Sequence, residues 1–110
     1  MTIENTDKVD GLGVDAQAQE AVLLISDHLS WHDVGEHFGF LEKKIGSYVS
    51  FINSGQLDQA LPNAKGLPVR IKLIHEHRPD SRSIEILDGL AGQLSGLGLR
   101  FSYEALPSGY

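Results

Sequence analysis

Five histidines are the residues of this chain best suited to chemistry, and three of them gather around one predicted helix start. These are His28, His32 and His37. The string from His32 to His37 superficially resembles the H-E-x-x-H zinc helix, whose histidines are four residues apart on one face. Here they are five residues apart, which separates them by about 140° around a helix. Surface pairs at helical spacing, such as His32 with Glu36, are the alternative interpretation.

His75 and His77 form a second candidate group. Alternate residues of a strand share a face, and an H-x-H pair on a strand can bind a metal. No carboxylate or cysteine is tied to the pair by spacing, so two histidines at the rim of the core are the competing interpretation. A metal-binding enzyme or sensor that uses His75 and His77, or His28, His32 and His37, stays an alternative function.

Other chemistries lack their motifs. The chain has no Cys, which removes thiol nucleophiles, thiolate metal sites and disulfides. It contains neither G-x-S-x-G nor G-x-x-x-x-G-K-S/T, the motifs of a nucleophile elbow and a phosphate-binding loop. We therefore predict no enzymatic activity, no cofactor and no bound metal.

Charge is distributed unevenly along the 110 residues, whose formal net charge is −6. Residues 1–42 hold nine acidic residues and one basic residue, whereas residues 43–110 hold six acidic and eight basic ones. An acidic half disfavours nucleic acid and anionic membrane surfaces. It is either a solvated face or a patch that steers a basic protein partner. The candidate contacts for such a partner are Asp10, Asp15, Asp27, Trp31, Asp33 and Glu36.

No segment has the pattern of a targeting or membrane signal. The first ten residues lack an apolar stretch, and the longest apolar run extends only from Ala21 to Ile25. A membrane span needs about 20 such residues. We therefore expect a cytoplasmic protein that does not interact with membranes.

Two strands and a long helix are predicted in the first half. Residues 9–14 and 20–26 read as strands joined in a hairpin. Ser30 to Asp33 has the S/T-x-x-D/E signature of a helix start. Apolar residues then recur at helical spacing up to Asn53, and Gly55 suits the position after a helix end. Lys44 falls on the predicted solvent face.

The second half alternates strand, helix and strand. After a connector at residues 56–68, residues 69–73 alternate apolar and basic side chains. A helix follows from about Pro79 to Gly96, and residues 97–105 alternate again. The strand–helix–strand unit predicts a parallel, right-handed crossover.

The order β-β-α-β-α-β predicts an α+β fold with two layers, in which one four-stranded mixed sheet carries two helices on one face. The length favours a single domain over residues 1–110. We expect residues 1–8 and 106–110 to be loose tails.

Several short blocks of the sequence together resemble a known group of proteins. They are Ser26 to Leu29, Trp31, Leu41 to Tyr48, Phe51 to Gln56 and Pro62 to Gly66. In these blocks the chain resembles a family of small bacterial proteins of unassigned function, over roughly residues 3–103. The resemblance implies a single bacterial domain and brings no catalytic residues. A looser similarity in kind, without a diagnostic motif, links the chain to immunity proteins of bacterial toxin systems.

The resulting functional prediction is a non-enzymatic, protein-binding module. Its most concrete form is a cytosolic immunity protein that neutralises a bacterial toxin, such as a basic nuclease, through an acidic surface. Besides the metal-binding alternative, the chain could be a homodimeric structural module that pairs through the outer face of its sheet.

Overall fold

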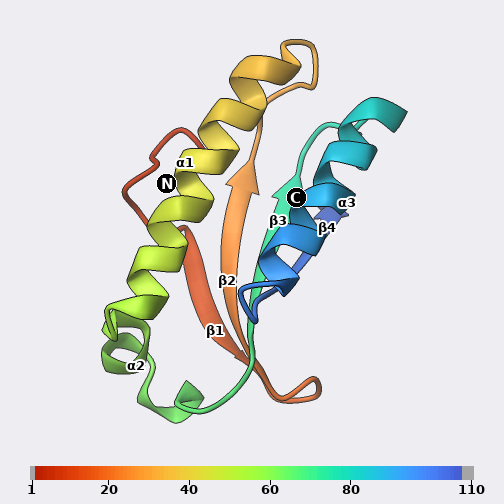
Figure 1. Ribbon diagram of the computed structural model, residues 1–110. Helices are drawn as coiled ribbons and strands as arrows, with labels where there is room; N and C mark the ends of the chain where they lie inside the picture. The colour runs from red at the N-terminus through yellow and green to blue at the C-terminus, as the bar shows by residue number, and fades with distance from the viewer. Residues whose placement is uncertain (1, 108–110) are drawn as a thin grey trace.

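The computed structural model describes residues 2–107 and confirms the α+β architecture (Figure 1). One four-stranded sheet carries its long helices on one side. The elements, in chain order, are β1 (Gly11–Asp15), β2 (Glu20–Asp27), α1 (Val34–Asn53), α2 (Gln56–Ala60), a 3-10 turn (Pro62–Ala64), β3 (Val69–His75), α3 (Ser81–Ser95) and β4 (Arg100–Ala105).

The strands lie side by side in the order β1-β2-β3-β4. The hairpin of β1 and β2 is antiparallel, as predicted, whereas β2, β3 and β4 are mutually parallel. The two parallel connections step across the sheet in the same direction. Crossovers of one hand then place both connecting helices on one face, which is where α1 and α3 lie.

Strand alternation divides the sheet into a covered and an open face. Leu23, Ile25, Ile71 and Leu73 point toward the helices and are fully buried. The residues between them point to the other face, which no described helix covers. The predicted two-layer arrangement is therefore confirmed.

Side-chain caps set where the two long helices begin. Asp33 is the N-cap of α1, and its side chain accepts a hydrogen bond from the backbone N–H of Glu36. Asp80 caps α3 in the same way through Ser83. Ser30 opens the predicted signature but does not cap the helix; the cap is Asp33, the last residue of the signature.

The N-terminal segment, residues 2–10, corrects the expectation of a loose tail. Ile3 is fully buried, and its N–H donates to the carbonyl of Ser26. Lys44, expected on the solvent face, is also fully buried. The reason is that the segment crosses α1 at this point and surrounds the ammonium group with oxygen atoms.

At the other end of the chain, Leu106 donates its N–H to the carbonyl of His75 and so continues the pairing beyond β4. Residues 108–110 of the expected C-terminal tail lie outside the described residues. The last strand begins at Arg100 rather than at residue 97, because Gly98 makes a turn with a φ of 79°. Leu97 is consequently exposed.

The sequence predicted no membrane-spanning segment, and the helices of the structure can be compared with that prediction. None of those formed within residues 2–107 combines the length and the apolar character that crossing a bilayer would require.

Candidate functional site

Histidines and carboxylates converge where β2 and β3 end and α1 begins. In sheets with parallel strands, this carboxyl edge is the usual place for ligands. Asp27 ends β2, and its register partner His75 ends β3. The connection from β2 to α1 brings His32 and Asp33 to the same edge.

A buried, hydrogen-bonded pair of side chains is the centre of this region. Nε2 of His37 and Oδ2 of Asp27 are 2.5 Å apart, and both side chains are almost completely buried. Nδ1 of His37 donates to the Ser30 carbonyl at 2.9 Å, since a carbonyl oxygen can only accept. The second Asp27 oxygen accepts from the Leu29 N–H. Both ring nitrogens and both carboxylate oxygens are thus occupied within the protein.

Trp31 closes this pair from one side. Its ring stacks on His37 with centroids 3.8 Å apart and planes 14° from parallel. Its Nε1 donates to the His77 carbonyl at 2.8 Å. Trp31 therefore joins the β2–α1 connection to the end of β3, and it is buried rather than offered to a partner.

A shallow groove beside the pair carries the exposed acids. Its volume is about 160 Å³. We call it the α1-start groove, and it is lined by Glu4, Leu29, Ser30, His32, Asp33, Glu36, His37 and Phe40. Glu4, Asp33 and Glu36 are exposed, whereas Leu29 and Phe40 are half-buried. Within residues 2–107, no lysine or arginine lines this groove. Its rim is therefore acidic and its floor partly apolar.

The six predicted contact residues do not form one surface. Asp33 and Glu36 lie together at the α1-start groove. Asp15 lies beside the start of β2, whereas the groove lies beyond the end of that strand. The Asp15 side chain accepts hydrogen bonds from the backbone N–H groups of Gln17 and Ala18 in the β1–β2 turn. Asp27 and Trp31 are buried.

The sixth residue, Asp10, is also inside. Its carboxylate receives the Lys44 ammonium at 2.7 Å and the Ser26 N–H at 2.9 Å. Such carboxylates are held by interior donors and cannot meet a partner in this conformation. The acidic surface is thus smaller than the sequence suggested.

The histidines are not arranged as a metal centre. His28 pairs with Glu4, His37 is bonded at both ring nitrogens, and His77 lies beyond the end of β3 and is exposed. Among residues 2–107 no three His, Asp or Glu side chains converge as a metal site would require.

His75 is the histidine with an open bonding position. It is buried, and its Nδ1 has no hydrogen-bond partner. Burial lowers the pKa of His75 below its ordinary value, while the carboxylates of Asp27 and Glu104 and the backbone of His77 oppose that shift. The neutral ring is consequently favoured.

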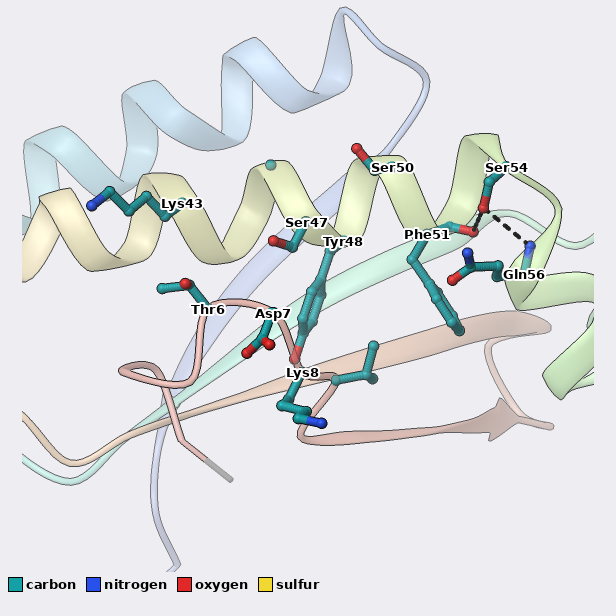
Figure 2. A pocket seen from close by; sticks show the side chains of 12 residues that line it. Thr6, Asp7, Lys8, Lys43, Ser47, Tyr48, Ser50, Phe51, Ser54 and Gln56 are labelled. Carbon is teal, nitrogen blue, oxygen red and sulfur yellow. Dashed lines mark hydrogen bonds between the residues drawn. The ribbon is translucent and has the colours of Figure 1, made fainter.

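A larger hollow lies elsewhere, between the N-terminal segment and α1 (Figure 2). It has a volume of about 670 Å³ and is open to solvent along the helix. Tyr48 points from α1 toward the segment, where its hydroxyl donates to the Leu24 carbonyl and accepts from the Asp10 N–H. Burial raises the pKa of Tyr48 well above its ordinary value. The side chains in view are mainly short and polar, with Lys8 and Lys43 apart from each other.

The comparison with protein families supports the resemblance seen in the sequence blocks. A family model matches residues 1–107. The chain belongs to DUF6572, a family of unknown function. No curated protein and no solved structure matches the chain. The function of this DUF6572 protein is therefore inferred from the contacts of its own residues.

Sequence reasoning missed the buried partners of α1, although a signal for them was present. His37, Leu41, Lys44 and Tyr48 are spaced by four, three and four residues, which is one helical stripe. Asp27 likewise continues the odd-numbered, inward-facing positions of β2. A polar residue on an apolar stripe indicates a buried group that needs a partner.

Proposed function

We propose that this protein is a non-enzymatic binding module, and that it binds a basic protein partner at the α1-start groove. The observation that carries the proposal is the juxtaposition of three exposed carboxylates, on Glu4, Asp33 and Glu36, around a partly apolar floor. Charged rims with apolar centres are characteristic of protein interfaces.

The electrostatics of the groove favour a basic partner. The chain has a net charge of −6, and the acids at the groove are contributed by two separate segments, the N-terminal segment and the start of α1. A surface of one sign raises the rate of encounter with a partner of the opposite sign. His32 on the same rim adds positive charge only when it is protonated.

The interior of the same region supports binding rather than acid–base chemistry. A general acid or base must reach the proton that it transfers. Asp27 and His37 are buried, and their polar atoms are bonded to each other, to Ser30 and to Leu29. This pair supports the groove by holding the β2–α1 connection in place.

In its most specific form, the proposal is that the partner is a bacterial toxin, such as a basic nuclease, and that this protein acts as its immunity protein in the cytoplasm. The support is the acidic groove together with the small size of the chain. Neutralisation would follow if the bound protein covered the basic surface with which the toxin holds its substrate.

Affinity purification from the native host tests the proposal. We expect the tagged chain to retain a basic protein in a one-to-one molar ratio. Glu36→Lys should lower the association rate by roughly tenfold at low salt, and should reduce its salt dependence. The matched control is Glu85→Lys, which makes the same charge change at an exposed position of α3 and should leave binding intact.

The immunity form requires a further result. Expression of the captured partner alone should arrest growth of a host cell, and co-expression of this chain should restore growth. Equal loss of binding in Glu36→Lys and Glu85→Lys would contradict the location of the site. A captured partner that is harmless when expressed alone would contradict the immunity function and leave the binding proposal standing.

A further inference from the structure

The open face of the sheet is a surface separate from the α1-start groove. Here side chains alternate with those that face the helices. Val22 and Leu24 of β2 and Ile74 of β3 lie at its centre, and all three are only half-buried. The wet face of an antiparallel or mixed sheet is usually polar, so an aliphatic centre indicates that another surface covers it.

A hollow at one edge of this face could accept a side chain from another molecule. Across from Val22, the edge strand β1 places Gly13, which has no side chain. The resulting hollow of about 240 Å³ includes Val22, Leu24 and Lys72. A Cβ added at Gly13 would meet no atom within 4 Å. The space beside the aliphatic centre is therefore free for a side chain from another molecule.

The charges around the centre balance one another. Glu20 accepts from Arg70 Nε and from Arg100 Nη1, each at 2.7 Å. Lys72 and Glu104 are 3.2 Å apart. Asp15, the register partner of Glu20, lines the same hollow. Three acids and three bases therefore lie on this face, and their formal charges cancel in a chain of net charge −6.

This charge pattern identifies the occupant. Neither a basic nor an acidic protein meets a net charge of opposite sign on this face. Two copies of an acidic chain repel each other, and they approach with the least repulsion through a neutral face. Paired rim charges around an apolar centre are also complementary to themselves, as a two-fold interface requires.

We propose that two copies of this chain associate through their open sheet faces, with the aliphatic centres of Val22, Leu24 and Ile74 in contact. The proposal does not depend on the α1-start groove. Strands of this length, about 4.8 Å apart, present a flat area of roughly 400 Å². A standard interface buries about 800 Å² on each partner, so the dimer is expected to be weak and to dissociate on dilution.

Sedimentation equilibrium over a range of protein concentrations tests the proposal. We expect the mass to rise from the 12.0 kDa of the monomer to twice that value as the concentration increases. Added salt should strengthen the association, because it screens the repulsion between two chains of net charge −6.

Gly13→Lys is the decisive variant, because a Cβ added at Gly13 would meet no atom within 4 Å and the longer side chain places a charge at the hollow. It should raise the dissociation constant by roughly tenfold or more. Gly92→Lys is the matched control: this glycine is exposed on α3 and its added Cβ would also meet nothing within 4 Å. Ile74→Lys, at the centre of the face, should weaken the dimer as Gly13→Lys does, and circular dichroism checks that each variant is folded.

Three results would overturn the proposal. The first is a wild-type monomer at every concentration up to the millimolar range. The second is a dimer that persists in Gly13→Lys and in Ile74→Lys. The third is a dimer that Gly13→Lys disrupts and Ile74→Lys does not, because this pattern would indicate pairing along the edge of β1 instead of across the face.

Discussion

The acids of the N-terminal half include two groups with opposite surroundings. Asp10, Glu20 and Asp27 have buried side chains, and each is paired with a basic group. Asp33 and Glu36 are exposed at the α1-start groove. The first group joins distant parts of the chain, whereas the second caps a helix and forms its surface.

The acidic stretch of residues 1–42 therefore does not form one acidic surface, because some of its carboxylates are buried. Removing one partner of a buried pair leaves a charge without compensation and strongly destabilises a protein. An exposed charge contributes little to stability but can control association. Substitutions of the buried acids should therefore lower stability, whereas substitutions of the exposed acids should mainly weaken binding.

Lys44→Met should produce the largest effect. The ammonium donates to the Asp10 carboxylate and to the carbonyls of Thr2 and Asn5, at 2.7–2.8 Å. We expect a loss of about 3–5 kcal/mol in the free energy of unfolding, measured by urea denaturation. Lys43→Met, at the exposed neighbouring position, should change it by less than about 0.5 kcal/mol. Equal effects of the two variants would contradict the structural role of Lys44.

Asp27→Asn should have the next largest effect. The amide keeps an oxygen for the Leu29 N–H but replaces the carboxylate oxygen that faces His37 with an NH2 group. A loss of about 2–3 kcal/mol is expected, together with a change in the near-ultraviolet circular dichroism of Trp31. Asp33→Asn is the control from the exposed group, because Asn also caps helices well. If the two asparagine variants were equally stable, the contrast between the groups would fail.

Glu20→Gln tests the buried group through its pH dependence. The hydrogen bonds from Arg70 and Arg100 lower the pKa of Glu20 below its ordinary value. The unfolded chain therefore binds this proton more readily, and stability is lost as the pH falls from the unfolded pKa through the folded one. The variant should be less stable by roughly 1–2 kcal/mol at neutral pH. Its melting temperature should also fall less steeply on acidification than that of the wild type, and an unchanged acid limb would refute this role.

Asp33→Ala should have the smallest effect on stability. Loss of the hydrogen bond to the Glu36 N–H should cost about 1 kcal/mol at the start of α1. Asp33→Asn should restore that stability without restoring the charge. Binding of the basic partner should be weakened in both variants, so stability and association would be separated at one position.

The regular elements could be predicted from the sequence because each depends on local periodicity. The stripe from Phe38 to Tyr48 and the alternation in residues 69–73 are visible in a one-dimensional pattern. The order of the elements then restricted the fold to a two-layer arrangement. The predicted signature has Asp33 as its last residue, and it is this residue rather than Ser30 whose side chain caps the helix.

The candidate site was only partly predictable, because its side-chain contacts join residues that are far apart in the chain. Lys44 and Asp10 are 34 residues apart in the chain, and no local pattern in residues 2–10 indicates that they cross α1. The partners of Glu20 are 50 and 80 residues away. Pairings of this kind depend on strand order and on the path of the connections.

The sequence alone determined the α+β class, the long first helix, the hairpin and the acidic balance of the first 42 residues. These properties follow from short-range spacing and from composition. Only the tertiary structure decided which carboxylates are interior and which remain at the α1-start groove. Whether a charge is buried depends on which distant donors surround it, and those are brought together only when the chain folds.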